Sequence, residues 1–412
     1  MASFEESYVI PLEKCILSNQ EQIEEVARFL GQICEKVAGI VGNFSPLFKY
    51  IFLTSAKFLK DQNSEEEKRL FHHMQQVEQK LNQIYDEFDK MERMEMRSLL
   101  NSQYFKYETH IKFQYKMYNK MFTAETNKEQ NIKNFITMFE NADGEQNLIG
   151  LYDQITEKNL SGRAMLDEIV RTEQRSRRAV EEFCSQLKKL FVFGIIALIG
   201  YTAVKKGDVE EDMVTYKIVK QWETRMEDMQ MRMKAAVDEC VNNFSTQAKM
   251  DVEMKLKGCN RQVDSEFAKS ILNDLVEKYD WVSWSVRVYT DGIKFRNCGL
   301  CGMLCNMLHR KQCHVSGPKE NYFDFGPCDK NIKILVSFTA NPKSLNKDQI
   351  KDQTEKEKSD VQSVAESLHR KFSGCLVHTV RRSNKIKEAN NFNSDNFYIG
   401  SHGTVYIYMH SE

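Results

Sequence analysis

Four cysteines and a histidine in the last third of the chain are the residues best suited to chemistry. They are Cys298, Cys301, Cys305, Cys313 and His314, with Cys328 beyond them. Closely spaced thiolates and an imidazole can supply the four ligands of a tetrahedral zinc site, in which His314 would replace one thiolate. This stretch, however, lacks the second C-x2-C or H-x3-H pair of a zinc knuckle. We therefore predict a loop of free thiols, with zinc binding and then disulfides as the alternatives.

Signatures of catalysis do not occur elsewhere in the sequence. It has no Walker loop, no Gly-x-Ser-x-Gly, no His-Glu-x-x-His and no dinucleotide-binding fingerprint. His72 and His73 are adjacent on a predicted helix, where they diverge by about 100° and cannot share a metal. We predict a protein that is not an enzyme and uses no cofactor; an enzymatic C-terminal domain is the third hypothesis.

Composition limits the partners and the compartment. The 412 residues are enough for two domains, and the net charge of -1 argues against nucleic acid as a partner. Only 5 prolines and 18 glycines interrupt the chain, which favours long helices. The first residues are acidic where a secretory signal is basic and then apolar. We therefore expect a cytoplasmic protein whose 11 cysteines are thiols.

The longest uncharged apolar run, residues 190–204, lies between Lys188-Lys189 and Lys205-Lys206. A helix that is apolar on every side must lie inside a bundle, in a bilayer, or in one and then the other. The run spans about 22 Å, or about 27 Å with snorkelling lysines, against a hydrocarbon core of about 30 Å. We predict a buried central helix, with permanent or conditional membrane insertion as alternatives. Its core-forming residues are Leu190, Phe191, Phe193, Ile195, Ile196, Leu198 and Ile199.

Amphipathic helices are predicted on both sides of this run. Heptad spacing predicts a helix from 65 to about 100, opened by the capping box of Ser64 and Glu67. A second, methionine-rich seam lies in a helix expected from about 209 to 256, and contains Val219, Trp222, Met226, Met229, Met233, Ala236 and Cys240. Further helices are expected near 20–37, 47–59, 101–122, 128–141 and 146–158, and from about 162 into the apolar run, with turns at 141–144 and 206–208.

Beyond residue 278 the apolar pattern changes to alternation. Four segments mix aromatic and β-branched residues with polar ones, which predicts strands at 281–289, 332–338, 375–380 and 405–409. A helix is expected from about 355 to 372, with the lysine-rich stretch 343–360 as its solvated approach. The predicted fold is therefore mainly α: a long antiparallel helical bundle around the apolar central helix at 15–278, followed by a small α+β domain at 279–412.

Taken in order, these features resemble the rapunzel / cephalotoxin-like family. The likeness rests on the apolar, glycine-punctuated helix pair at 37–59, the junction from Lys60 to Glu66, the lysine-flanked apolar helix, and Tyr279-Asp280-Trp281 before the C-terminal domain. The resemblance implies a helical domain similar to α-helical pore-forming toxins, in which amphipathic helices shield a hydrophobic helix that can be presented to a membrane. It implies no catalytic residues. The expected lack of a signal peptide departs from the secreted, toxin-like members.

The preferred hypothesis is a non-enzymatic helical-bundle protein that interacts conditionally with anionic membranes. Five arginines could contact headgroups, although a solvated helix face is the simpler interpretation; they are Arg163, Arg171, Arg175, Arg177 and Arg178. The alternative is a cytosolic scaffold that never enters a membrane and binds a protein partner through the seam 219–240 or the C-terminal domain. Exposure of 190–204 in the native state would favour the membrane hypothesis, and complete burial would favour the scaffold.

Overall fold

A computed structural model describes residues 102–123, 127–157, 163–206, 213–257, 265–290, 312–328 and 332–412. The helices predicted before residue 102, including the heptad helix and His72-His73, lie outside these residues. The chain divides into two compact units, one up to Val241 and the other from Asn242 to Glu412. Each unit has hydrophobic clusters of its own.

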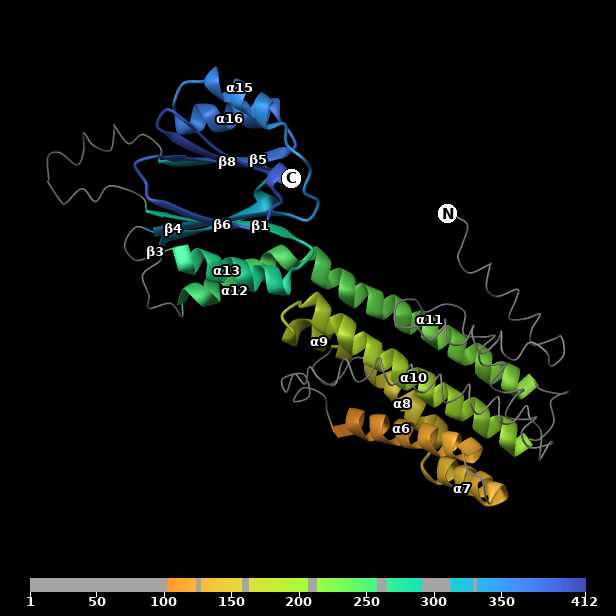
Figure 1. The fold of residues 1–412 in the computed structure, drawn as a ribbon. Coiled ribbons are helices and arrows are strands. Elements are labelled where there is room, and N and C mark those ends of the chain that lie inside the picture. The colour runs from red at the N-terminus through yellow and green to blue at the C-terminus, as the bar shows by residue number, and fades with distance from the viewer. Residues whose placement is uncertain are drawn as a thin grey trace. The chain divides into compact units, whose positions relative to one another are not determined.

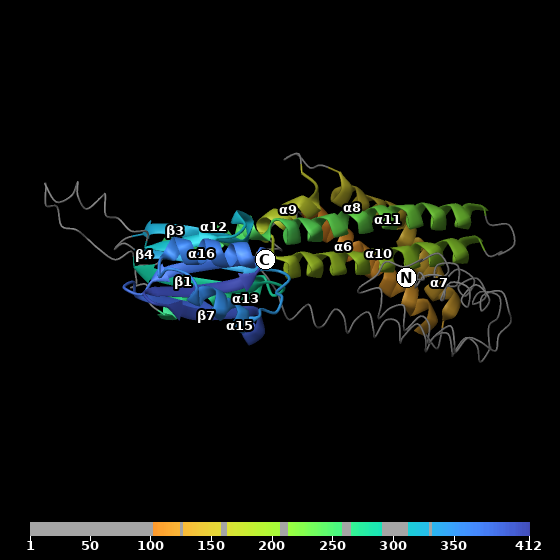
Figure 2. The same ribbon diagram turned by 90° about the horizontal axis from the view of Figure 1, so that it is seen from above.

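Six helices of the described residues form the first unit, which we call the helical unit. α10 and α11, of 30 residues each, lie side by side and run in opposite directions (Figures 1 and 2). α6 packs along α10, and α7 and α8 pack against both. The predicted bundle around the apolar helix is therefore confirmed. The helices are α6 (Ser102–Thr123), α7 (Lys128–Asn141), α8 (Gly144–Thr156), α9 (Met165–Thr172), α10 (Arg177–Lys206) and α11 (Met213–Asn242).

The prediction of a single helix from about 162 into the apolar run is wrong, because the helix is interrupted between α9 and α10. Gln174 and Arg175 have left-handed backbones, with φ of 49° and 55°. The N–H of Arg175 donates to the carbonyl of Val170, which closes the end of α9. Left-handed backbone costs an L-residue about 1–2 kcal/mol, and neither glycine nor proline marks this break in the sequence.

The helix predicted from about 209 to 256 is also divided, into α11 and α12 (Phe244–Lys257). Ala248 and Val252 of α12 are buried in the same cluster as α13 (Ser265–Lys278) and its neighbouring sheet. α12 and α13 thus belong to the second unit. The sequence analysis had assigned both of them to the helical bundle, which it ended at residue 278. An amphipathic pattern reveals an apolar face but not which surface that face covers.

The second unit, which we call the C-terminal unit, has four layers: helices, sheet, sheet, helices (Figure 1). One sheet has the order β3-β4-β1-β6 and the other β2-β5-β8-β7, and every pairing is antiparallel. α13, with α12 beside it, covers the first sheet, and α15 (Lys347–Glu355) and α16 (Val361–Lys371) cover the second. The strands are β1 (Ser283–Thr290), β2 (Cys313–Ser316), β3 (Tyr322–Cys328), β4 (Ile332–Thr339), β5 (Cys375–Arg381), β6 (Ile386–Asn390), β7 (Phe397–His402) and β8 (Val405–Ser411).

The predicted α+β character and the four predicted strands are confirmed, the strands as β1, β4, β5 and β8. The helix predicted from about 355 begins later, as α16, where the Asp360 side chain accepts hydrogen bonds from the N–H groups of Gln362 and Ser363. The stretch expected to be its solvated approach contains α15. Ile350 and Thr354 of α15 are buried, so this segment contributes to the core beneath it.

Alternate residues of the central strands face the covering helices and the opposite sheet. In β1, Val286 lies in the cluster under α13 and Tyr289 in the cluster between the sheets. In β5, Val377 lies under α16 and Val380 between the sheets. Each central strand is thus buried on both faces.

Among the described residues, the two halves of the C-terminal unit repeat the same order of elements. α12, α13, β1, β2, β3 and β4 correspond to α15, α16, β5, β6, β7 and β8. Each half contributes its second strand to the edge of the other half's sheet, because β2 pairs with β5 and β6 pairs with β1. Short 3-10 helices, Lys319–Asn321 and Ser394–Asn396, precede β3 and β7 at equivalent points. The unit is therefore an internal repeat whose halves exchange one strand.

The strand registers extend this correspondence to single residues. The first residues of β3 and β7 pair with Ser337 of β4 and His410 of β8. These two residues pair in turn with positions of β1 and β5 that lie two residues before Arg287 and His378. Arg287 and His378 therefore occupy equivalent positions in the two halves.

Candidate functional site: the shielded apolar helix

The apolar run of α10 lies in the core of the helical unit. The seven residues expected to form the core are each at most 6% exposed: Leu190, Phe191, Phe193, Ile195, Ile196, Leu198 and Ile199. Within 190–204 only Tyr201 is half-buried rather than buried. Among the described residues, Arg177–Lys205 is the one helix long and apolar enough to cross a membrane, and 89% of its apolar window is buried. The run is therefore a central core helix, as predicted.

Small residues let α6 and α8 approach α10 closely. A Cβ atom at Gly194 would overlap the side chain of Leu148 in α8 and lie 3.4 Å from Cγ2 of Ile111 in α6. Beside it, the rings of Tyr115 and Phe193 stack with their centroids 4.1 Å apart. Glycine has no Cβ, so it permits this spacing without an overlap.

The methionine-rich seam of α11 faces the same core. Trp222 is 0% exposed and its ring lies 6.3 Å from that of Phe191. Farther along α11 the seam residues Met226, Met229, Met233, Ala236 and Cys240 are buried as well. Their surface is therefore already covered by the helical unit itself.

The lysines that flank the apolar run differ in their surroundings. Lys189 is buried and its ammonium lies 5.4 Å from the centroid of the Phe193 ring. Lys205 is exposed, and its Nζ donates to Glu140 of α7 at 2.7 Å and to the hydroxyl of Tyr201 at 2.8 Å. These hydrogen bonds raise the pKa of Lys205. The C-terminal end of the run is thus tethered to α7 by an ion pair at the surface.

The shield around α10 contains polar groups without hydrogen-bond partners. Gln114 and Asn119 of α6 are 1% and 9% exposed, and the Nε2 of Gln114 and both amide atoms of Asn119 are unpaired. The indole Nε1 of Trp222 in α11 is likewise buried and unpaired. A buried polar group that lacks a partner costs about 1–3 kcal/mol. Two helices that cover α10 are therefore less stably packed than apolar helices of the same shape would be.

The five arginines that could have met anionic headgroups are each paired with a glutamate. All these pairs have at least one partner that is partly exposed, so each contributes little to stability. The structure thus favours the solvated, internally neutralised helix face over a free basic patch. The pairs are Arg163 and Arg171 with Glu168, Arg175 with Glu239, Arg177 with Glu181, and Arg178 with Glu182.

The candidate zinc ligands are only partly described. Cys298, Cys301 and Cys305 lie outside the described residues, and Cys313 and His314 are consecutive in β2, so their side chains point to opposite faces of the sheet. The thiol of Cys313 accepts a hydrogen bond from the hydroxyl of Tyr289 at 3.3 Å, in the layer between the sheets. Among the described residues no group of three or more His, Cys, Asp or Glu side chains could hold a metal ion.

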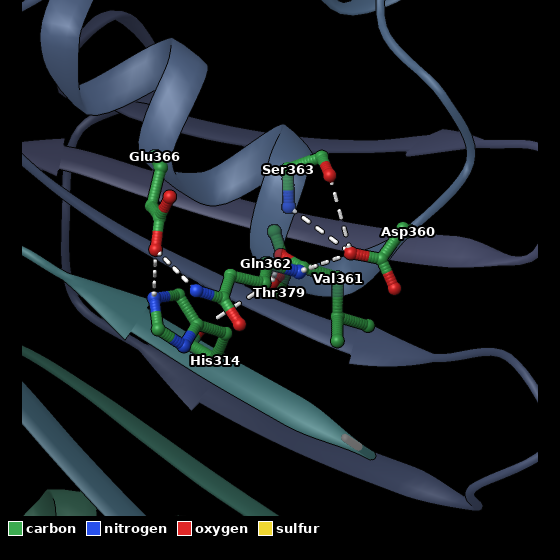
Figure 3. A network of polar contacts seen from close by, with 7 residues as sticks. All are labelled: His314, Asp360, Val361, Gln362, Ser363, Glu366 and Thr379. Atoms are coloured by element: carbon green, nitrogen blue, oxygen red, sulfur yellow. Dashed lines mark hydrogen bonds and ion pairs between the residues drawn. The ribbon is translucent and has the colours of Figure 1, made fainter. Parts of the chain in front are cut away.

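His314 instead faces α16 on the outer side of its sheet (Figure 3). Its Nε2 lies 3.6 Å from Oε1 of Glu366, which also accepts a hydrogen bond from the side chain of Gln362 at 2.6 Å. The Thr379 hydroxyl donates to the carbonyl of Val361 at 2.6 Å and secures the start of α16 to β5. This network connects β2, β5 and α16. Because His314 and Cys313 point to opposite faces of the sheet, His314 cannot replace a thiolate on a metal that Cys313 binds.

A buried polar layer between the two sheets was not predicted. Arg287, Ser337, His378 and His410 are each 0% exposed. Their strands alternate apolar and polar residues, a pattern that the sequence analysis used only to predict strands. Both faces of these strands are covered, so the polar alternates are buried.

The family model that matches this chain covers mainly its helical part. Residues 60–262 match the cephalotoxin-like middle helical domain. The resemblance to the rapunzel / cephalotoxin-like family is confirmed. Protein rapunzel of Danio rerio is 27% identical over 166 residues, which make up 39% of this chain and 70% of rapunzel. No solved structure matches the chain.

The cephalotoxin-like region contains every described helix from α6 to α12. It therefore includes α10 and the helices that cover it, and it ends before α13 and the two sheets. The shielded apolar helix lies in the part of the chain that matches this family model. The layered C-terminal unit lies mostly beyond the match.

Proposed function

We propose that the helical unit is a non-enzymatic, membrane-interacting module. In solution it keeps α10 shielded, and it presents α10 to an anionic membrane when the bundle is loosened. The observation that carries this proposal is a helix with the length and composition of a membrane span, held in the core by amphipathic helices. The cephalotoxin-like match covers these helices.

The polar groups in the shield support a conditional rather than a permanent interaction. Nearly complete burial of 190–204 means that the resting helical unit offers no apolar surface from this run to a bilayer. The unpaired amides of Gln114 and Asn119 favour separation of α6 from its neighbours, because separation would return them to water. Release of α6 would uncover the face of α10 that contains Gly200.

The alternative function is a scaffold that binds a protein partner and never enters a membrane. Burial of the apolar run was the outcome expected to favour it. The seam proposed as its binding surface, however, is buried from Trp222 to Cys240 in the helical unit's own core. A partner would have to bind elsewhere, for example around the exposed side chain of Met231.

Vesicle leakage tests the membrane proposal. The full chain is mixed with dye-loaded anionic or neutral vesicles across a range of pH and salt. We expect binding and leakage with anionic vesicles under conditions that loosen the bundle, since each basic group near an anionic surface contributes about 1 kcal/mol. Absence of binding and leakage under every condition would leave the scaffold as the better proposal.

Variants of α6 connect leakage to the shield. The double substitution Gln114→Leu/Asn119→Leu removes the unpaired amides, so it should stabilise the resting bundle and reduce leakage. Gln130→Leu is the matched control, because Gln130 is exposed on α7 and bonds only to its neighbour Asn134. Equal leakage from the double variant and the control would contradict the role proposed for α6.

A further inference from the structure

The layer between the two sheets of the C-terminal unit contains an unusual concentration of buried ionisable groups. Arg287 comes from β1, His378 from β5 and His410 from β8, and none of them is exposed. The guanidinium of Arg287 lies 5.4 Å from the ring centroid of Tyr408, and the His378 ring lies 6.1 Å from the same ring. Stacked sheets are ordinarily held together by apolar side chains. Here a cation and two imidazoles share that layer with apolar side chains such as Leu335 and Val380.

Several of these groups lack the hydrogen bonds that buried polar atoms normally make. Both ring nitrogens of His378 are unpaired, as are Nε and Nη1 of Arg287. Other groups of the layer are paired: Ser337 accepts a hydrogen bond from Nη2 of Arg287 and lies 2.9 Å from Nε2 of His410, whose Nδ1 lies 2.7 Å from the carbonyl oxygen of Ser411. Most buried polar groups in folded proteins are paired. The unpaired atoms therefore make the closed arrangement of the two sheets less stable than it would be if they were hydrogen-bonded.

The net charge of the layer depends on pH. At neutral pH the positive charge of Arg287 is offset by Glu388, its cross-strand neighbour in β6, and both histidines are neutral. Protonation of the histidines would place two further positive charges beside Arg287 with no added anion. Like charges in a medium of low dielectric constant repel strongly.

We propose that the two sheets of the C-terminal unit separate in mildly acidic solution, driven by protonation of His378 and His410 beside Arg287. The two halves of the internal repeat carry equivalent residues on either side of this layer, so the layer lies between matching faces. Separation would bring the histidines into water and uncover buried inner-face residues such as Leu335 and Val380.

The sign of the pH effect follows from the histidines. Burial lowers the pKa of His378 well below its ordinary value of 6.5, and lowers that of His410 to about 3. The open state takes up protons below pH 6.5, whereas the closed state does not, so the closed state loses stability as pH falls. Burial raises the pKa of Glu388, which acts in the opposite sense at lower pH. Near pH 6 the two histidines therefore have a larger effect on the stability of the closed state than Glu388 has.

The other ionisable groups around the layer do not change this balance. Tyr289 of β1 and Tyr408 of β8 face it, and burial raises the pKa of both, so they stay neutral in acid. His314 of β2 is near enough to act on His378 electrostatically, and its own proton would add to the positive charge. Asp324 of β3 acts on Tyr289 and Tyr322, and it is not among the groups that shift the pKa of His378 or His410.

Hydrogen exchange of the full chain, read by mass spectrometry and corrected for the intrinsic effect of pH, tests the proposal. We expect exchange from β1 and β5 to accelerate by about 10-fold to about 100-fold per pH unit below the ordinary histidine pKa, since one or two protons are taken up on opening. In the variant His378→Phe/His410→Gln the acceleration should fall below about 3-fold per pH unit. Exchange from α10 serves as the internal reference for the helical unit.

Two further variants keep the test decisive if the double variant does not fold. Arg287→Met retains both histidines but removes the neighbouring cation, so opening should require a lower pH than in the unmodified protein. His402→Gln is the matched control, because His402 is half-buried at the sheet edge and bonds to the carbonyl of Glu357. The same pH dependence in the control and in Arg287→Met, or an unmodified protein whose exchange does not accelerate in acid, would overturn the proposal.

Discussion

Gly200 of α10 lies so close to Tyr118 of α6 that a Cβ atom at this position would overlap the tyrosine ring. Tyr118 is 1% exposed and its ring packs 5.8 Å from that of Phe135 in α7. The ring is therefore enclosed in the core and is not free to turn out into solvent. One glycine thus determines how closely the principal shielding helix approaches the apolar helix.

The substitution Gly200→Ala should destabilise the helical unit. Alanine favours helix by about 1 kcal/mol over glycine, but overpacking against a fixed ring costs about 1–3 kcal/mol. We expect a lower denaturation midpoint for the helical signal in urea. Gly374→Ala is the control, since a Cβ atom there meets nothing within 4 Å. An unchanged or higher midpoint for Gly200→Ala would show that α6 and α10 are not packed this closely in solution.

A charge in the middle of the apolar run should act as a core lesion. Ile196 is 2% exposed, so Ile196→Asp would bury a carboxylate without a partner. This costs several kcal/mol, comparable to the roughly 5–15 kcal/mol by which a domain is stable. We expect loss of soluble protein and of cooperative thermal unfolding. Met231→Asp, at a side chain that is 65% exposed on α11, should behave like the unmodified protein.

How much of the fold could be predicted depended on burial. The apolar run and the four central strands are buried on both faces, so their residues carry strong patterns, and these elements were predicted. The four strands that were missed, β2, β3, β6 and β7, are the edges of the two sheets. Edge strands are half-exposed and mix polar residues with apolar ones, as in β7, where Ile399 is 55% exposed. Their sequences therefore lack the signal used to find strands.

Some features of the candidate site could likewise be predicted from the sequence, and others could not. Burial of residues such as Ile196 followed from composition alone, because a helix that is apolar all round needs cover. The pairing of Arg175 with Glu239 could not be predicted in this way, since it depends on which helices lie together. The other arginines pair with glutamates three to five residues away, a spacing that the sequence itself contains. The polar layer was missed because Arg287 and His378 are far apart in sequence, and only the packing of the two sheets places them in one layer.

Two buried thiols should make the helical unit sensitive to alkali. Burial raises the pKa of Cys184 in α10 to about 12 and that of Cys240 in α11 to about 11, from an ordinary 9.0. Stability is complete below pH 9.0 and falls as pH rises towards these values, by at most about 1.4 kcal/mol per pH unit for each thiol. We expect the urea midpoint to fall between about pH 9 and about pH 11. The variant Cys184→Ala/Cys240→Ala should show a smaller fall, and an equal fall would contradict this origin.

Metal analysis tests the cysteine-rich stretch. Cys313 faces the layer between the sheets and His314 faces Glu366 of α16, so no single ion can bind both. We expect the purified chain to contain no stoichiometric zinc and its thermal unfolding to be unchanged by a chelator, while the thiols react with a thiol reagent under native or mildly denaturing conditions. His314→Gln should shift stability by less than about 1 kcal/mol, the value of a partly exposed ion pair. One zinc per chain, lost to a chelator together with the C-terminal unit's stability, would instead show that Cys298, Cys301, Cys305 and Cys313 bind metal.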